Sequence, residues 1–177
     1  MYTEKVVEHF RHPHNMGKMK EYSAVGKVGN ILCGDVMWLY IRVAKDEQGR
    51  DVLADVSWET FGCTAAIATS SMVSDLAKGR TLEEAITISN RDVANELGGL
   101  PPIKMHCSGL AADALNEAIY EYMTKEGREI PAALQERHEH IQKDMATLEE
   151  RYKVFLDRGA AKAGKDDASP AAEPSCS

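Results

Sequence analysis

Three cysteines stand far apart in the chain, each in a local setting that suits a metal ligand. They occur in the segments Cys33-Gly34-Asp35, Gly62-Cys63-Thr64 and His106-Cys107-Ser108. The thiolate form of cysteine binds metal, and thiolates favour zinc and the iron of iron–sulfur clusters. If folding brings the three thiols together beside one exchangeable oxygen or nitrogen ligand, we expect a site that holds iron, zinc or a cluster without locking it in place.

Two residues beside the cysteines are candidates for the fourth ligand. Asp35 follows Cys33 by two positions, so both side chains point to the same face if the chain is extended there. His106 precedes Cys107 and offers an imidazole nitrogen. Taken alone, Asp35 is equally compatible with a turn residue and His106 with a solvated or core histidine, so the choice stays open.

The positions of Cys63 and Cys107 in the sequence also predict that their thiolate forms are stabilised. Each precedes an expected helix start, at Thr64 and at Ser108. Free backbone N–H groups and the helix dipole favour negative charge at such positions. We therefore expect the pKa of both thiols to be lowered.

The remaining cysteine and the N-terminal histidines are assigned no chemistry. Cys176 lies in a polar tail without turn glycines or ligand neighbours, and is interpreted as an incidental thiol. His9, His12 and His14 are expected to be surface residues rather than a metal cluster.

Composition and charge narrow the class of protein. A chain of 177 residues predicts one domain with room for an extension. The net charge of −7 argues against nucleic-acid binding, which needs a basic surface. No apolar signal segment or membrane-length apolar run is present, which favours a cytoplasmic location, where thiols stay reduced. Four cysteines in that setting favour metal or sulfur chemistry over disulfides.

The pattern of apolar residues predicts a small sheet followed by helices. Strand character marks residues 25–30, 35–44 and 52–60, and the polar loop 45–51 predicts a hairpin. A short helix over residues 2–11 precedes them. Further helices are expected over residues 64–79, after the capping-box residue Thr81, over residues 90–97 with Asn90 as the cap, and over residues 108–127.

A last helix is expected after Pro131. Its apolar residues recur at steps of three and four, as in a short heptad seam, at Leu134, Ile141, Met145, Leu148, Tyr152 and Phe155. An amphipathic helix lying on the domain and a coiled coil with a partner fit this pattern equally. Residues 159–177 have the composition of a disordered tail.

Taken in order, five segments resemble the scaffold proteins of iron–sulfur cluster assembly, namely the IscU family and the N-terminal domain of NifU. The resemblance covers about residues 2–125. The N-terminal helix and its following turn are similar to the family's helix and Asn-Pro-Arg-Asn-Val-Gly-type turn. The five segments are 2–17, Cys33-Gly34-Asp35, residues 62–71, Leu100-Pro101-Pro102-Ile103-Lys104 and His106-Cys107-Ser108.

The resemblance implies an α+β fold, a small three-stranded antiparallel sheet with helices packed on one face, as the element pattern indicates independently. We expect a scaffold domain over residues 1–127, an extension helix over 128–158 and a disordered tail over 159–177. The implied function is assembly of a [2Fe-2S] cluster from desulfurase-derived sulfur and iron, and its transfer to apo-proteins. A scaffold of this kind is not an enzyme.

The resemblance also assigns roles to residues. Cys107 is the expected sulfur acceptor, and Cys33, Cys63 and Cys107 would hold iron or zinc, with Asp35 or His106 completing the site. Asp35 would keep the cluster labile. The segment Leu100-Pro101-Pro102-Ile103-Lys104 resembles the part read by a dedicated Hsp70 chaperone and its J-type co-chaperone. A cysteine desulfurase and apo iron–sulfur proteins are the other implied partners, and a homodimer is left open.

Two alternatives and three departures accompany this interpretation. A zinc-containing SufU-type sulfurtransferase is the main alternative, but such chains carry an insertion between the second and third cysteines and lack the histidine at the position of His106. A closed structural zinc module lacks a Cys-x-x-Cys pair here. The family's proline close before the first cysteine is replaced by Ile31-Leu32, the stretch between Cys33 and Cys63 is slightly longer, and residues 128–177 have no counterpart in a bare scaffold.

Overall fold

The computed structural model describes residues 1–30 and 33–163, with side chains described to residue 153. The Ile31-Leu32 departure and the part of the predicted tail that holds Cys176 lie outside the described residues. Among the described helices, none combines the length and apolar character that crossing a bilayer requires.

The sheet is three-stranded and antiparallel, with the order β1-β2-β3. Its strands are β1 (Ala24–Gly29), β2 (Val36–Lys45) and β3 (Asp51–Phe61). The predicted hairpin between β2 and β3 is confirmed. Asp46 closes its loop by accepting hydrogen bonds from the backbone N–H groups of Gln48 and Arg50, and Gly49 takes a positive φ of 77°.

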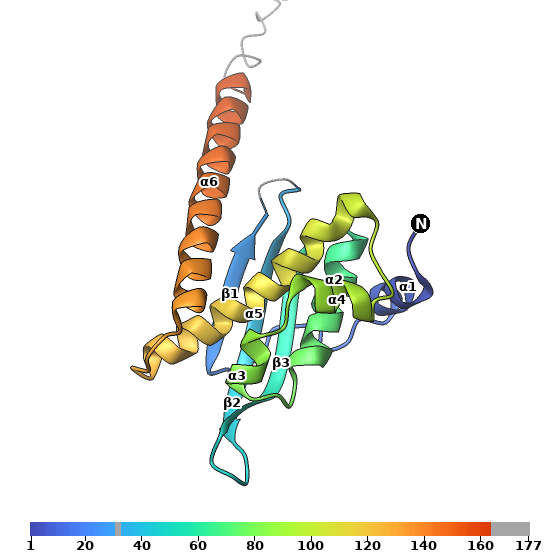
Figure 1. Ribbon diagram of the computed structural model, residues 1–177. Helices are drawn as coiled ribbons and strands as arrows, with labels where there is room; N and C mark the ends of the chain where they lie inside the picture. The colour runs from blue at the N-terminus through green and yellow to red at the C-terminus, as the bar shows by residue number, and fades with distance from the viewer. Residues whose placement is uncertain (31–32, 164–177) are drawn as a thin grey trace, which may run out of the picture.

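Helices cover one face of the sheet, as the predicted α+β class requires (Figure 1). They are α1 (Glu4–Arg11), α2 (Thr64–Ala77), α3 (Leu82–Ile86), α4 (Asn90–Glu96), the 3₁₀ turn η1 (Pro102–Lys104), α5 (Met105–Lys125) and α6 (Ala132–Ala163). The predicted capping box at Thr81 is confirmed. Ser89, rather than the expected Asn90, caps α4, because its side chain accepts from Asp92 while Asn90 is already helical.

Small residues let α5 lie directly on β1. A Cβ at Gly26 would stand 2.1 Å from the carbonyl oxygen of Ala114 and 2.6 Å from the backbone nitrogen of Ala118. Both atoms belong to the helix backbone, which cannot turn aside as a flexible side chain can. Glycine at this position therefore sets the distance between the sheet and α5.

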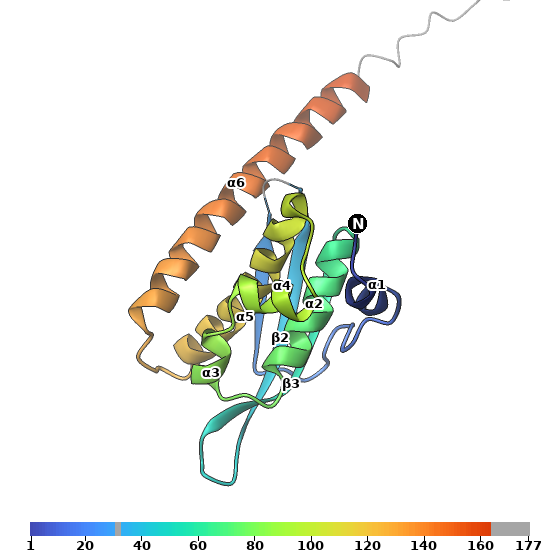
Figure 2. The ribbon, with the colours of Figure 1, turned by 45° about the vertical axis from the view of Figure 1, so that its right-hand side comes forward.

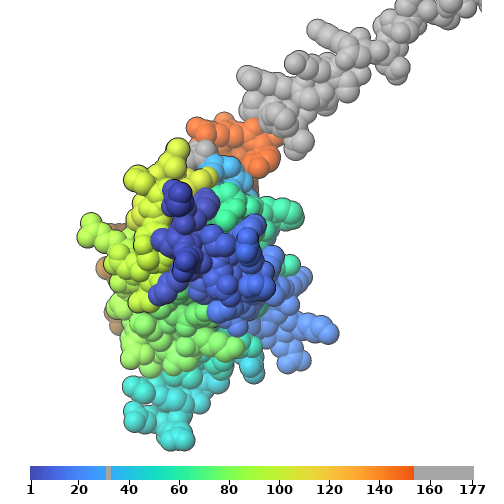
Figure 3. All heavy atoms as spheres, turned by 90° about the vertical axis from the view of Figure 1, so that its right-hand side faces the viewer, coloured from blue at the N-terminus to red at the C-terminus, as the bar shows by residue number. Residues whose placement is uncertain are grey.

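The N-terminal segment lies across α2. Thr3 caps α1, and Val6 is fully buried in the core shared with the sheet. Figure 3 shows these first residues spread over one face of the molecule.

The extension helix α6 folds back along β1 and α5 (Figures 1 and 2). His138 stacks on Tyr120 with ring centroids 3.8 Å apart, and its Nδ1 lies 2.7 Å from a carboxylate oxygen of Glu117. Four of the predicted seam residues are buried, namely Leu134, Ile141, Met145 and Leu148. The seam therefore packs on its own domain, while Tyr152 is 52% exposed and the Phe155 side chain lies outside the described part. The helix continues past residue 158 to Ala163.

We predict opposite effects for two glycine-to-alanine changes at the α5 interface. Gly26→Ala forces the α5 backbone away from β1, and is expected to lower the free energy of unfolding by about 2 kcal/mol or more. Gly109→Ala lies inside α5 with no neighbouring atom within 4 Å of its new Cβ, and is expected to raise it by about 1 kcal/mol. Urea unfolding followed by circular dichroism measures both, and a Gly26→Ala protein as stable as the parent would contradict the close packing.

Candidate metal centre

The predicted ligands meet where β2 begins, β3 ends and two helices start. Val36 pairs with Phe61, so Asp35 just before β2 lies beside Gly62 just after β3. A Cβ at Gly62 would lie 3.2 Å from an Asp35 carboxylate oxygen and 2.7 Å from the Cβ of Ala66. Glycine therefore allows the carboxylate to approach the start of α2.

Two of the three cysteines lie side by side with that carboxylate. The Cys63 and Cys107 sulfurs are 3.8 Å apart, and one ligand atom from each of Asp35, Cys63 and Cys107 lies within 4.8 Å of the others. A tetrahedral ion with metal–sulfur bonds of about 2.3 Å separates its sulfurs by about 3.8 Å. The spacing of the two thiols therefore matches that of metal ligands.

Cys33 stands at the rim of this group rather than inside it. The thiol is exposed and does not belong to the set of mutually close ligand atoms. Gly34, which follows Cys33, takes a φ of 74° and donates its backbone N–H to the carbonyl of Asn30. Partial desolvation first, and then a side-chain hydrogen bond with Asp35 and the charges of Asp35 and Cys63, raise the pKa of the Cys33 thiol, against a backbone hydrogen bond at Asp35 that lowers it.

The two candidates for the fourth ligand differ in position. Asp35 belongs to the close group, and its Oδ2 is buried without a hydrogen-bond partner among the described residues. His106 lies outside the close group, although its Nε2 is likewise buried and unpaired within the described part of the chain. A buried carboxylate oxygen beside two thiols fits a bound cation, because an unpaired buried acceptor is otherwise costly.

The expectation of a lowered thiol pKa is wrong for Cys107. Helix α5 begins at Met105, so Cys107 lies within its first turn instead of ahead of it. Its side chain is 0% exposed, and this burial, reinforced by the nearby Cys63 thiolate, raises the pKa of Cys107. Desolvation outweighs the helix dipole here, because removing the thiolate from water destabilises it more than the dipole stabilises it. Cys63, in contrast, is the N-cap of α2 as the sequence predicts.

Lys104 connects the predicted chaperone-binding segment with the thiols. Its ammonium nitrogen lies 3.7 Å from the Cys63 sulfur, and the thiolate charge of Cys63 raises the pKa of Lys104. The neighbouring Ile103 side chain is 78% exposed. One end of the Leu100–Lys104 segment thus touches the site while its middle faces solvent.

Sequence reasoning missed that α6 reaches the cysteine loop. The Tyr152 hydroxyl lies 3.6 Å from where a Cβ on Gly34 would stand. Leu148 and Met145 pack close to Gly29, at the end of β1 that leads into the loop. The heptad seam, which includes Tyr152, was the available signal, but it does not reveal which surface the seam covers.

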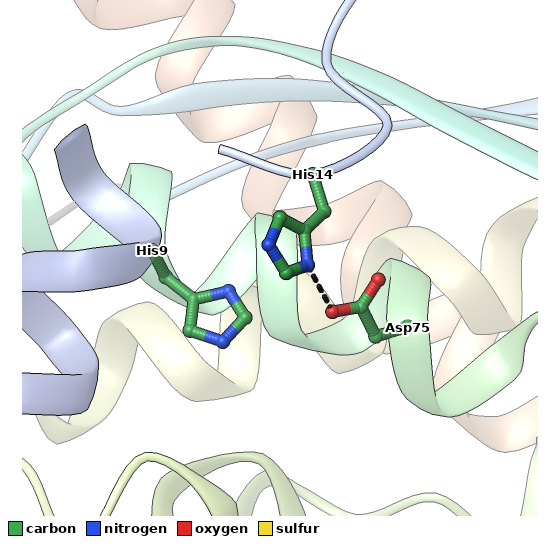
Figure 4. A group of neighbouring side chains, drawn as sticks. All are labelled: His9, His14 and Asp75. Atoms are coloured by element: carbon green, nitrogen blue, oxygen red, sulfur yellow. Dashed lines mark hydrogen bonds and ion pairs between the residues drawn. The ribbon is translucent and has the colours of Figure 1, made fainter. Parts of the chain in front are cut away.

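A second group of ligand side chains was also missed. His9, His14 and Asp75 present ligand atoms within 4.8 Å of one another, on the side where α1 packs on α2 (Figure 4). The prediction that His9 is a surface residue is wrong, since it is only 8% exposed. No local spacing relates residue 75 to residues 9 and 14, so the sequence held no signal for this group.

Comparison with known proteins defines the class of this chain. The family model for the NifU-like N terminal domain matches residues 1–129. The chain is 53% identical over 128 residues to the iron-sulfur cluster assembly scaffold protein IscU 1 of Archaeoglobus fulgidus, covering 72% of this chain and 80% of that protein. It is 41% identical over 143 residues to the IscU scaffold protein of Aquifex aeolicus, covering 78% and 89%. The chain belongs to the NifU-like N-terminal domain family.

Solved structures agree on the fold. The NifU-like protein (N-terminal) from Brucella abortus superimposes with a TM-score of 0.53 at 20% identity, covering 70% of this chain and 94% of that one. The three-stranded sheet with its helical layer is therefore the family's fold.

We predict that the cysteines differ in reactivity after metal has been removed with a chelator. Iodoacetamide is expected to modify exposed Cys33 well before buried Cys107. Burial limits access to Cys107, and each unit by which its pKa is raised lowers the thiolate fraction at neutral pH about tenfold. Mass spectrometry of timed samples measures the order.

The matched control is the same reaction in urea, where the two rates should converge. Raising the pH should speed the modification of Cys107, because a larger fraction becomes thiolate. Equal rates in the folded protein would contradict the burial of Cys107.

Proposed function

We propose that this protein is a scaffold on which an iron–sulfur cluster is assembled from sulfur and iron and then passed to apo-proteins. The observation that carries the proposal is the convergence of Asp35, Cys63 and Cys107, with Cys33 at the rim, in a chain of the NifU-like family. Three thiols and one carboxylate supply the soft, anionic donor set that iron of a [2Fe-2S] cluster prefers.

The mixed character of the ligands suits a transient cargo. Thiolates bind iron firmly, whereas a carboxylate is a harder and weaker partner for it. Exposed Cys33 leaves one side of the site open to solvent, where iron can enter and a cluster can leave. Zinc can occupy the same thiolates, so bound zinc in a preparation is compatible with the proposal.

We propose Cys107 as the residue that accepts sulfur from a cysteine desulfurase. In this step the Cys107 thiolate attacks the outer sulfur of the enzyme's persulfide, and the enzyme's cysteine leaves as its thiolate, with no net oxidation. Buried Cys107 becomes accessible if the first turn of α5 opens. That turn has no side-chain cap at its start, and the Thr69 hydroxyl donates to the carbonyl of Cys107, so this bond must break when the turn opens.

A persulfide formed on Cys107 lies close to the other ligands. Its neighbour Cys63 is 3.8 Å away, so the accepted sulfur arrives within the cluster site. Burial also shields a persulfide from reductants in solution.

Persulfide mapping tests this assignment. The protein is incubated with a cysteine desulfurase and cysteine, alkylated and digested, and the modified peptide is identified by mass spectrometry. We expect a persulfide on Cys107 that is lost in Cys107→Ser and retained in Cys33→Ser. A persulfide on Cys33 that survives Cys107→Ser would instead assign acceptance to the exposed rim.

Asp35→Ala tests the role of the carboxylate. Removing this buried negative charge is expected to lower the cost of holding thiolates beside it, because the charge of Asp35 raises the pKa of both Cys33 and Cys107. We therefore expect a cluster that persists longer and passes several-fold more slowly to an apo-ferredoxin. Anaerobic reconstitution with desulfurase, cysteine and ferrous iron, followed by visible spectroscopy, measures both.

Glu47→Ala, in the exposed hairpin loop, is the matched control and should behave as the parent does. Equal or faster loss of the cluster from Asp35→Ala would contradict the role of Asp35. Sulfur turnover with retained zinc and no cluster in the parent would contradict the scaffold itself and favour a sulfurtransferase.

The remaining partners follow from the same proposal. The segment Leu100-Pro101-Pro102-Ile103-Lys104 would be read by an Hsp70 chaperone with its J-type co-chaperone, and the exposure of Ile103 supports this. Because Lys104 touches Cys63, binding there would reach the thiols directly. We place this chemistry in the cytoplasm. His106, next to Cys107 in the chain, remains an alternative to Asp35 as the fourth ligand.

A further inference from the structure

Three polar side chains gather where α1 and its following turn lie on α2. His9 comes from α1, His14 from the turn behind it, and Asp75 from the last turn of α2. Figure 4 shows the two imidazole rings next to each other, tilted by 52°, with the carboxylate on the side of His14 away from His9. Their ligand atoms lie within 4.8 Å of one another, and the two ring centroids are 4.7 Å apart.

Neighbouring groups hold His9 and His14 in this arrangement. The Ser71 hydroxyl lies 2.8 Å from His9 Nδ1, and also accepts the backbone N–H of His14 at 2.8 Å. The His14 carbonyl accepts the indole N–H of Trp58, whose side chain is fully buried. The His9 ring is therefore fixed by a buried hydroxyl, and the backbone of His14 is anchored to Ser71 and Trp58, while the His14 ring is partly exposed.

The carboxylate is held from a second direction. The Asn15 side-chain amide donates to one oxygen of Asp75 at 3.1 Å, while the other oxygen lies 2.5 Å from His14 Nδ1. Asn15 takes a φ of 55°, a left-handed conformation that few residues other than glycine tolerate. The turn is thus shaped to bring its side chains onto the end of α2.

Two imidazoles and one carboxylate form a donor set for divalent first-row metals. Bonds of about 2.0–2.1 Å would place the donor atoms about 3.3 Å apart, which small side-chain rotations from the present spacing achieve. His14 and Asp75 are partly exposed, which leaves a path for the ion and room for water ligands.

We propose that His9, His14 and Asp75 form a second, sulfur-free site for a divalent first-row transition metal, of which Zn²⁺ is the test ion. An ion bound there joins α1 and its turn to α2, so it stabilises the docked N-terminal segment.

The proposed site is separate from the cysteine centre. Cys63 caps the start of α2 and Asp75 lies in its last turn, twelve residues further on, which corresponds to about 18 Å along a helix. No single ion can bridge the two, so each can be tested without the other.

The first experiment removes the thiols from the measurement. Zn²⁺ is titrated by calorimetry into untagged full-length protein carrying Cys33→Ser, Cys63→Ser and Cys107→Ser, after its fold has been checked by circular dichroism. We expect about one equivalent of Zn²⁺ to bind and the midpoint of thermal unfolding to rise. Loss of all zinc binding in this folded protein would overturn the proposal.

The matched variants identify the ligands. His14→Arg keeps a hydrogen-bond donor beside Asp75 but removes the ligand nitrogen, and Asp75→Asn keeps the shape but removes the carboxylate. Both are expected to weaken Zn²⁺ binding at least about tenfold. His12→Ala changes an exposed histidine outside the group and should bind as the parent does. Unchanged affinity in His14→Arg, or an equal loss in His12→Ala, would overturn the assignment.

A second measurement covers the case in which the serine variant does not fold. The parent is first loaded with zinc at its thiolates, and Co²⁺ is then added while the histidine ring signals are followed by NMR. Selective broadening of His9 and His14 without thiolate-to-cobalt charge-transfer absorption supports the site, and equal broadening of all histidines overturns it. Because no cysteine takes part, this result is independent of whether the protein assembles clusters.

Discussion

Close packing of helix backbones on the sheet is the constraint on which the candidate metal centre depends. Gly26 lets the backbone of α5 pack directly on the backbone of β1. Most of the buried residues of α2 are alanines and serines, whose small side chains also allow close packing. Both helices start at the end of the sheet where β2 begins and β3 ends. The starts of α2 and α5 and the start of β2 thus place Cys63, Cys107 and Asp35 close together without any covalent link between them.

The same packing sets the electrostatics of the centre. Burial of Cys107 disfavours its thiolate, and the charges of Cys63 and Asp35 disfavour it further. A cation with its own positive charge reverses this balance, because it stabilises all three anions at once. Without a cation, burial and the neighbouring charges favour the neutral thiol of Cys107, so binding of an ion is coupled to loss of its proton.

The sequence predicts much of this and fails where long-range packing decides. Cys33, Cys63 and Cys107 each carry a local signal, and the resemblance to the scaffold family implies that they meet at one site. The structure brings Cys63 and Cys107 together and leaves Cys33 at the rim. The burial of Cys107 is not predictable, because it depends on how closely α5 packs on the sheet and on a helix start three residues earlier than the pattern indicates. The approach of His9 and His14 to Asp75 rests on tertiary docking of α1. Amphipathic spacing in α6 likewise fits a partner helix or the chain's own domain. The tertiary contacts decide, among them Leu148 against Gly29 and His138 against Tyr120.

The edges of the sheet have a consequence for how this protein meets others. On the outer side of β1, the Val25 backbone N–H donates to the Glu121 carboxylate at 2.7 Å, and α6 runs alongside. On β3, Gly17 donates to the carbonyl of Trp58, and Leu53 exchanges backbone hydrogen bonds with the turn after α2. An incoming strand would have to displace these bonds before it could lengthen the sheet. We therefore expect a partner protein to bind through loops and side chains rather than by adding a strand to the sheet, and such contacts dissociate more easily.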